Sequence, residues 1–173
     1  AIGSRPVDQH LKGLQAMGAQ IEVVDGYVKA EAKHGLIGAD ICMDLVTVGG
    51  TENLMMAACL ARGQTRLVNA ACEPEVIDLG NFLAALGARI SGHGTSEIVI
   101  DGVHELAGCE YQIMPDRIEA GTYMIAAAIT QGSIKLMDLQ PDALGVVFEK
   151  LEQTGAQIDV GADWVALDMQ GRR

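Results

Sequence analysis

Hydrophobic positions near the start of the chain recur first with helical spacing and then with strand spacing. Apolar residues on one face of 11–17 predict a helix, and Gly18 follows at a position where helices commonly end. Alternating apolar residues then predict strands around 21–23 and over 27–30, joined by an Asp-Gly turn at 25–26. The sequence therefore predicts a helix followed by a β-hairpin.

The same helix–strand–turn–strand phrase occurs three times. "LQAMGAQIEVVDGYVKA" returns as "LAALGARISGHGTSEIVI" and as "LEQTGAQIDVGADWVAL", and the central glycines Gly18, Gly87 and Gly155 are 69 and 68 residues apart. A second phrase, "NLMMAACLARGQTRLVNA", returns as "TYMIAAAITQGSIKLMDL". Each repeat is predicted to hold two helices and about four strands, close to a small βαβ-type domain. We expect an α/β chain of about two and a half such units rather than a helical array.

Three of the four prolines mark the start of a unit. Pro6, Pro74 and Pro141 precede the central glycines by 12 to 14 residues, so each is predicted to open a helix. Proline suits the first turn of a helix because the N–H that it lacks would have no partner there.

Arg5 departs from the charge preference of a helix start. Acidic residues are favoured at a helix start, and the second and third predicted starts have Glu73, Glu75 and Asp142 there. A guanidinium beside unpaired N–H groups instead concentrates positive potential and favours an anion. Arg5 could simply pair with Asp8 or another surface carboxylate, but the broken pattern leads us to prefer an anion-binding role.

A second candidate site is "DLVTVGGTENL", where a helix is predicted to begin at 49–51. Glycines let the backbone approach a ligand, and the helix start offers N–H groups. Tight turns explain most Gly-Gly pairs, and the stretch lacks the Lys of a Walker A loop. "SGHGTSE" is interpreted as a hairpin tip. A third group of charged residues lies near predicted helix starts: Glu73, Glu75, Asp116, Arg117, Glu119. The preference of helix starts for acidic residues can account for Glu73 and Glu75. The role of Arg117 stays open, because it lies between acidic residues.

Composition narrows the classes of function. The chain of 173 residues is 49% hydrophobic and only 3% aromatic, so an aliphatic core is expected, with Met55 and Met56 in it. A formal net charge of −11 disfavours a nucleic-acid partner, and no apolar run is long enough to span a bilayer. The cysteines lack CxxC spacing, so we expect no metal site and four reduced, mostly buried thiols in a cytosolic protein: Cys42, Cys59, Cys72, Cys109.

Four stretches together resemble the UDP-N-acetylglucosamine 1-carboxyvinyltransferases, a family of bacterial enolpyruvyl transferases. They are "AIGSRPVDQHLKGLQAMGAQIE", "MDLVTVGGTENLMMAACLARGQT", "NAACEPEVIDLGNFLAALGARISGHGT" and "MPDRIEAGTYMIAAAI". The resemblance runs along essentially the whole chain and distinguishes it from the sister shikimate-pathway transferase. It implies two domains, each an inside-out α/β prism of three units. Residues 1–114 would belong to the first, UDP-sugar-binding domain and 115–173 to the second.

The resemblance also implies a reaction and a site. The family moves the enolpyruvyl group of phosphoenolpyruvate to the 3′-hydroxyl of UDP-N-acetylglucosamine, the first committed step of peptidoglycan synthesis, with no cofactor or metal. Arg5 would be catalytic and contact both substrates, while Glu73, Glu75 and Arg117 could face the cleft. Leu45 stands where many members have Lys. Arg5 would bind substrate near the transferred group, and the implied pocket for uridine and diphosphate is lined by Pro6, Val7, Asp8, Gln9, Leu45, Val46, Thr47, Val48 and Gly49.

The family's catalytic Cys, the target of fosfomycin, lies on a loop directly before the motif that begins this chain. None of the four cysteines here lies in a matching motif, so none is given that role. The missing Met and abrupt start lead us to expect a piece of a longer enzyme that acts only with its other segments. The alternatives are a non-catalytic nucleotide-sugar-binding module and a purely structural repeat protein, and the latter leaves Arg5 unexplained.

Overall fold

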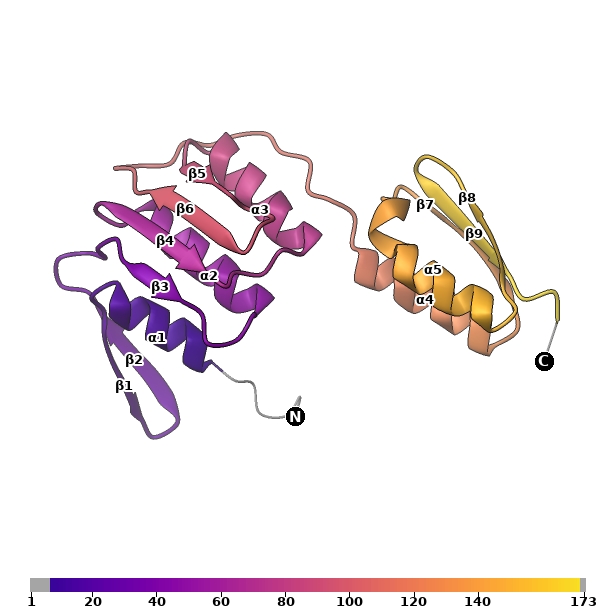
Figure 1. Ribbon diagram of the computed structural model, residues 1–173, viewed down its shortest axis with the longest axis horizontal. Helices are drawn as coiled ribbons and strands as arrows, with labels where there is room; N and C mark the ends of the chain where they lie inside the picture. The colour runs from indigo at the N-terminus through magenta and orange to yellow at the C-terminus, as the bar shows by residue number, and fades with distance from the viewer. Residues whose placement is uncertain (1–6, 172–173) are drawn as a thin grey trace. The chain divides into compact units, whose positions relative to one another are not determined.

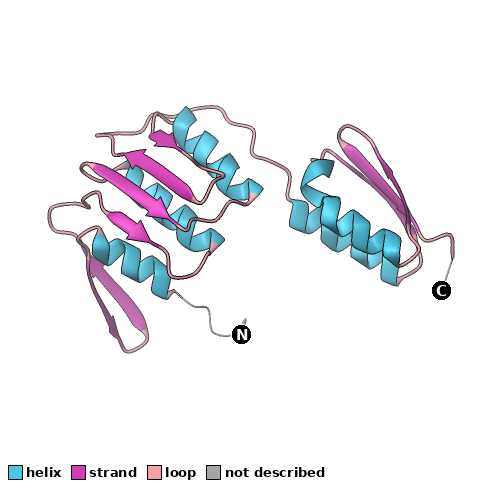
Figure 2. Cartoon of the chain, in the orientation of Figure 1, coloured by secondary structure: helices cyan, strands magenta, loops and turns pink. Residues whose placement is uncertain are grey.

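The computed structural model describes residues 7–171, which divide into two compact units, Ala1–Gln112 and Ile113–Arg173. Each unit has its own buried core. The first unit holds a four-stranded sheet and a separate two-stranded hairpin, and the second holds a three-stranded sheet (Figure 1). Helices and strands alternate along both units (Figure 2), which confirms the α/β class.

One complete repeat lies in the first unit. Its sheet has the order β3-β4-β6-β5, in which β3 and β4 are parallel and the other neighbours are antiparallel. This β-α-β-α-β-β arrangement has the two helices and four strands that the sequence predicts. Its elements are β3 (Asp40–Cys42), α2 (Val48–Cys59), β4 (Gln64–Val68), α3 (Pro74–Ala85), β5 (Arg89–Ser91) and β6 (Glu97–Asp101).

Parts of the same repeat lie before and after it. In the first unit, a helix and a separate antiparallel hairpin match its second half: α1 (Asp8–Ala16), β1 (Gln20–Val24) and β2 (Tyr27–Glu31). In the second unit, the sheet order β7-β9-β8 reproduces β4-β6-β5, and α4 and α5 pack on that sheet. These elements are α4 (Arg117–Ile129), β7 (Ser133–Met137), η1 (Pro141–Leu144), α5 (Gly145–Gln153), β8 (Gln157–Val160) and β9 (Trp164–Asp168).

The three central glycines end three helices with the same geometry. Gly18, Gly87 and Gly155 have φ of +90°, +102° and +94°, a left-handed conformation that glycine adopts without strain. Each glycine N–H bonds to the carbonyl three residues earlier, and the next N–H bonds to the carbonyl five residues earlier. This hydrogen-bond pattern is a Schellman motif, and it confirms the predicted helix ends.

The prolines give a mixed result. Pro74 is the first residue of α3, as predicted, whereas Pro141 opens the short 3₁₀-helix η1 and α5 begins only at Gly145. A 3₁₀ turn aligns positions three apart, so Pro141 and Leu144 are both buried. Pro6 lies outside the described residues.

Helix α2 forms the centre of the first unit. It packs against α1, α3, β4 and β6, and Leu54, Met55, Ala58 and Cys59 on it are fully buried. Gly13 of α1 lets the helices approach, because a Cβ there would lie 2.5 Å from the Leu54 methyl carbons. The predicted aliphatic core is present in both units, with Met124, Val165 and Leu167 fully buried or nearly so in the second.

Two expectations about buried side chains are wrong. Of the four cysteines only Cys59 is buried; Cys42, for example, alternates along its strand with the buried Ile41 and Met43 and so faces outward. Met56 is 48% exposed because it follows Met55 on the helix and points to a different side.

Two threonines are buried completely but differ in their hydrogen bonding. Thr51 Oγ1, near the start of α2, accepts a hydrogen bond of 3.0 Å from the Ala71 N–H. Thr65 Oγ1, on β4, has no hydrogen-bond partner within the described residues. Thr51 therefore ties the start of α2 to the segment that leads into α3.

We expect Thr51→Val and Thr65→Val to have different effects on the free energy of unfolding. The first leaves the buried Ala71 N–H unsatisfied and should cost about 1–3 kcal/mol, whereas the second removes an unpaired hydroxyl and should be neutral or stabilising. Urea unfolding of the two variants beside the wild type measures both values. Equal losses would show that the Thr51 hydrogen bond adds nothing.

Candidate functional site

The two segments predicted to line a ligand pocket lie side by side in the first unit, although about 35 residues separate them. The Asp44 N–H donates to Gln9 Oε1 at 3.0 Å, and Gln9 Nε2 donates to Asp44 Oδ2 at 3.3 Å. A Cβ added to Gly49 would lie 3.9 Å from His10 Cε1. The N-terminal turn of α1 and the start of α2 therefore border the same surface.

Lys12 completes this contact. Its Nζ lies 2.7 Å from both carboxylate oxygens of Asp44. The hydrogen bonds from Lys12 and then Gln9, with the Lys12 charge, lower the pKa of Asp44. A further polar contact between the helices joins Asn53 Nδ2 and His10 Nδ1 at 3.0 Å. Polar side chains of α1 thus hold the segment that follows β3.

Thr47 caps α2, as the helix start predicted from the Gly-Gly stretch requires. Its Oγ1 accepts from the Gly50 N–H at 3.4 Å, and its carbonyl accepts from the Thr51 N–H at 3.0 Å. Val48 and Gly49 supply the first N–H groups of the helix, which have no acceptor within it. Gly50 is buried, and a Cβ there would lie 2.5 Å from Thr47 Cγ2. Glycine at this position lets the capping threonine pack against the helix.

The residues around these N–H groups are apolar and exposed. Val7, Leu45 and Val46 are 43%, 70% and 57% exposed, and Asp8 is exposed beside them at the start of α1. Apolar side chains therefore border a helix start that was predicted to bind an anion. Arg5 and Pro6, the other two residues predicted to bind substrate, lie outside the described residues.

A group of carboxylates lies near the starts of α2 and α3. Glu73 is the N-cap residue of α3, and its Oε2 is buried without a hydrogen-bond partner in the described part of the chain. Glu75 lies in the first turn of the same helix. Glu52, which the sequence analysis missed, faces both: burial first, then the charges of Glu75 and Glu73, raise the pKa of Glu52. No three His, Cys, Asp or Glu residues among 7–171 form a cluster that could hold a metal ion.

Arg117 is in the second unit, apart from this group along the chain. It is the first residue of α4, directly after the N-cap residue Asp116, whose Oδ1 accepts from the N–H groups of Ile118 and Glu119. Helix capping thus explains Asp116. Because the two units are described separately, the prediction that Arg117 faces a cleft with Glu73 and Glu75 stays a prediction.

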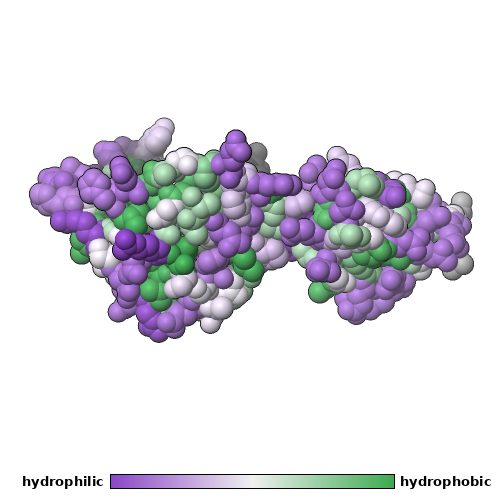
Figure 3. Space-filling view, turned by 90° about the horizontal axis from the view of Figure 1, so that it is seen from above, coloured by the Kyte–Doolittle hydropathy of each residue, from purple (hydrophilic) through white to green (hydrophobic). Residues whose placement is uncertain are grey.

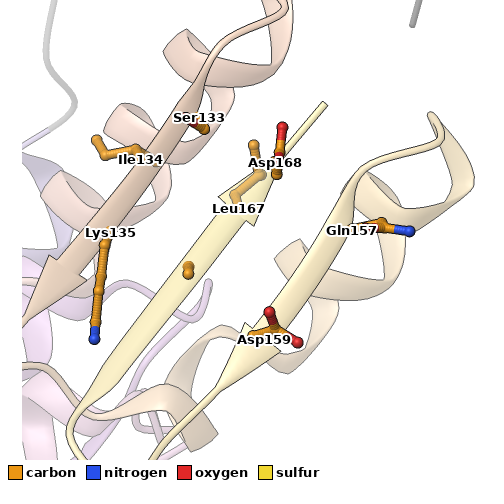
Figure 4. Close-up of a pocket in the computed structure, with 8 residues that line it drawn as sticks. Ser133, Ile134, Lys135, Gln157, Asp159, Leu167 and Asp168 are labelled. Atoms are coloured by element: carbon orange, nitrogen blue, oxygen red, sulfur yellow. The ribbon is translucent and has the colours of Figure 1, made fainter. Parts of the chain in front are cut away.

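A hollow of about 400 Å³ on the sheet of the second unit has a simpler explanation than a site (Figure 4). Ala166 lies between Lys135 and Asp159 in the cross-strand register, so a short side chain separates two long ones. Lys135 Nζ is instead placed 4.1 Å from the centre of the Trp164 ring. None of the predicted site residues lines this hollow.

The surface also carries apolar patches, as the face in Figure 3 shows. Some exposed apolar residues recur with the repeat. Met56 on α2 and its C-cap residue Leu60 are exposed, as are Ile125 and Ile129 on α4, which lie 69 residues later. No helix within 7–171 is both long and apolar enough to cross a membrane.

The sequence matches the family described as EPSP synthase (3-phosphoshikimate 1-carboxyvinyltransferase) over residues 1–173. The chain belongs to this family. Within it, the chain is 59% identical over its whole length to a UDP-N-acetylglucosamine 1-carboxyvinyltransferase of Coxiella burnetii and 57% identical to one of Cellvibrio japonicus. It spans only 40% and 41% of those two proteins.

Solved structures share the fold. The enolpyruvyl transferase NikO from Streptomyces tendae has a TM-score of 0.81 and 24% sequence identity, covering 95% of this chain and 42% of NikO. An EPSP synthase from Acinetobacter baumannii has a TM-score of 0.64 and 25% identity, covering 95% of this chain and 39% of that one. These matches confirm the fold expected from the resemblance.

The site contains residues that sequence reasoning did not find. Lys12, Asp44 and Glu52 lie within the motif stretches, but no role was predicted for them, and their partners lie more than 20 residues away along the chain. The one available signal was a charged residue, Asp44, two residues after the end of β3. Only the packing of α1 beside α2 gives that residue its partners.

Glu52→Gln should stabilise the protein at pH 7 and have little effect at pH 3.5. Folding raises the pKa of the Glu52 carboxyl above its ordinary value of 4.5, so the folded protein favours the protonated form. The stability that this form contributes is present below pH 4.5 and is lost as the pH rises through the folded-state pKa. The amide keeps the size of the side chain and removes the charge. Thermal unfolding midpoints at both pH values measure the difference.

The matched control is Glu105→Gln, at an exposed position in the same unit. It should leave the difference between the two midpoints as it is in the wild type. If Glu52→Gln raised the midpoint equally at both pH values, the charge of Glu52 would not be the cause.

Proposed function

We propose that the protein containing this chain transfers the enolpyruvyl group of phosphoenolpyruvate to the 3′-hydroxyl of UDP-N-acetylglucosamine, the first committed step of peptidoglycan synthesis. The names of the 59% and 57% identical relatives support this substrate. The structural observation that carries the proposal is the Thr47-capped start of α2 beside the first turn of α1, with Val7, Leu45 and Val46 around it.

The geometry suits a nucleoside diphosphate. The N–H groups of Val48 and Gly49 and the positive end of α2 would hold the diphosphate oxygens. The exposed apolar side chains of Leu45 and Val46 would lie along the uracil ring, with Val7, Asp8 and Gln9 bordering it from α1. Leu45 provides no charge, so this side of the pocket would depend on apolar contact and backbone groups.

The reaction is an addition followed by an elimination. The 3′-hydroxyl of the sugar attacks C2 of phosphoenolpyruvate, its proton passes to a base, and C3 takes up a proton, giving a tetrahedral ketal. Loss of a proton from C3 then expels inorganic phosphate and restores the double bond. Arg5 would lie at the reacting end, where a guanidinium stabilises the phosphate and the accumulating negative charge, and Pro6 would line the nucleotide pocket.

The remaining assignments follow from this proposal. Residues 1–114 would belong to the UDP-sugar-binding domain and 115–173 to the second domain, with Glu73, Glu75 and Arg117 facing the substrate cleft. The enzyme would act in the cytoplasm with its other segments, without nucleic acid, membrane or cofactor. Its product would serve cell-wall biogenesis, cell shape and division, and fosfomycin would inhibit it.

For the 173-residue chain by itself, we propose nucleotide-sugar binding without turnover. The chain spans 40% of the Coxiella burnetii relative, and the family's catalytic Cys has no counterpart among the four cysteines. Binding of UDP-N-acetylglucosamine by the isolated chain, without phosphate release, is the expected behaviour.

Arg5→Ala in the full-length protein should lower kcat/KM at least about a hundredfold, because a cation that acts in the transition state is removed. Phosphate release from phosphoenolpyruvate in the presence of UDP-N-acetylglucosamine measures it. Unchanged turnover in Arg5→Ala would remove the catalytic role of Arg5, and no release of phosphate by the wild type would overturn the proposed function.

Thr47→Val in the full-length protein should instead raise mainly the KM for UDP-N-acetylglucosamine, because it loosens the start of α2.

A further inference from the structure

We propose that Asp44 is a positioning residue, which sets the shape of the nucleotide pocket by holding residues 44–47 against α1. The inference rests on the proposed function, because it concerns the same pocket. It also changes the role of Gln9: this side chain would act on the ligand through Asp44 rather than by direct contact.

The segment from β3 to α2 is fixed at both ends. At its start, the Met43 N–H donates to the Val68 carbonyl, and Asn69 Nδ2 donates to the Met43 carbonyl at 2.9 Å. At its end, Thr47 is held by its capping bonds to the first turn of α2. Leu45 and Val46 lie between these points, and both are more than half exposed.

Between these ends, Asp44 supplies the contact with another element. Within the described residues, the hydrogen bonds from 44–46 to α1 all come from Asp44, through its N–H and its two carboxylate oxygens. Packing cannot replace them, because Leu45 and Val46 point largely into solvent. The position of these two side chains therefore depends on a polar contact.

Gln9 is suited to this structural use. Its carbonyl oxygen accepts from the Asp44 N–H, and its amide nitrogen donates to the Asp44 carboxylate, so both ends of the amide are engaged by one residue. Such a reciprocal pair fixes the backbone and the side chain of Asp44 together. While these bonds are in place, only the second N–H and the second lone pair of the Gln9 amide are left for a ligand.

Lys12 makes a carboxylate acceptable beside a diphosphate. Its Nζ bonds to both oxygens of Asp44 and balances the negative charge that would otherwise repel an anionic ligand. The ion pair is exposed, so it adds little to the free energy of unfolding. Its effect is to fix the position of Asp44 and to balance the local charge. Loss of the pair should affect the pocket without unfolding the protein.

The test measures the KM for UDP-N-acetylglucosamine in the full-length protein. Asp44→Ala, which removes three of these exposed hydrogen bonds, and Gln9→Met, which removes two, should each raise it about five- to tenfold, with kcat and the KM for phosphoenolpyruvate within about twofold of wild type. The double variant should raise the KM by clearly less than the product of the two single effects, since both changes remove the bond from Gln9 Nε2 to Asp44 Oδ2.

Arg66 and Glu97 provide the matched control. They form another exposed two-bond ion pair of the first unit, at 2.8 Å, between β4 and β6 and not in the predicted pocket. Glu97→Gln should leave both KM values unchanged. Thermal midpoints within a few degrees of wild type would show that the Asp44 and Gln9 variants remain folded.

A second readout does not need activity. Hydrogen exchange at the amides of 44–47 should become faster in Gln9→Met, first at Asp44, whose N–H loses its acceptor. If the wild type releases no phosphate, the proposed function fails, and unchanged exchange would then overturn the positioning role by itself. If the wild type is active, an unchanged KM in the single variants, or effects that multiply in the double variant, would overturn it while the proposed function stands.

Discussion

The burial of α2 against α1, α3, β4 and β6 is the contact around which the first unit is arranged. Leu54 needs the bare backbone of Gly13 beside it, so α1 can approach α2 closely. The same packing leaves the first turn of α2 at the surface, next to the start of α1. A well-packed apolar helix thus presents its polar end, where hydrogen-bond donors are unsatisfied, at one defined place. The candidate pocket exists because the core fixes that place.

Two regions near the start of α2, one around Asp44 and one around Glu52, differ in their local charge. Around Asp44, a lysine balances the carboxylate and the pKa of that group is lowered. Around Glu52, the neighbouring charges are also negative, and burial and repulsion raise its pKa. An anionic ligand is compatible with the first region and opposed by the second. In an acidic chain, local pairing decides where an anion can bind rather than net charge.

The sequence predicted much of this structure because its signals are local. The glycines at 18, 87 and 155 end helices in any context that keeps their left-handed backbone, and the 69-residue repeat follows from elements that recur in the same order. The proximity of 9–10 to 44–49 was expected only through a family resemblance, since no local signal joins the two segments. Lys12, Asp44 and Glu52 were missed. Met56 was expected in the core and the cysteines were expected to be mostly buried, but Met56 and three of the four cysteines are exposed.

The sequence by itself determined the α/β class, the repeat, the helix ends and the family, because periodicity, glycine conformation and motifs act within a few residues or within one repeat. Only the tertiary structure decided that Gln9 bonds to Asp44 rather than facing outward, which of Met55 and Met56 is buried, and which carboxylates repel one another. Each of these depends on distances between side chains that are far apart in the chain. Such distances are fixed by the packing of whole elements and leave no mark in the local sequence.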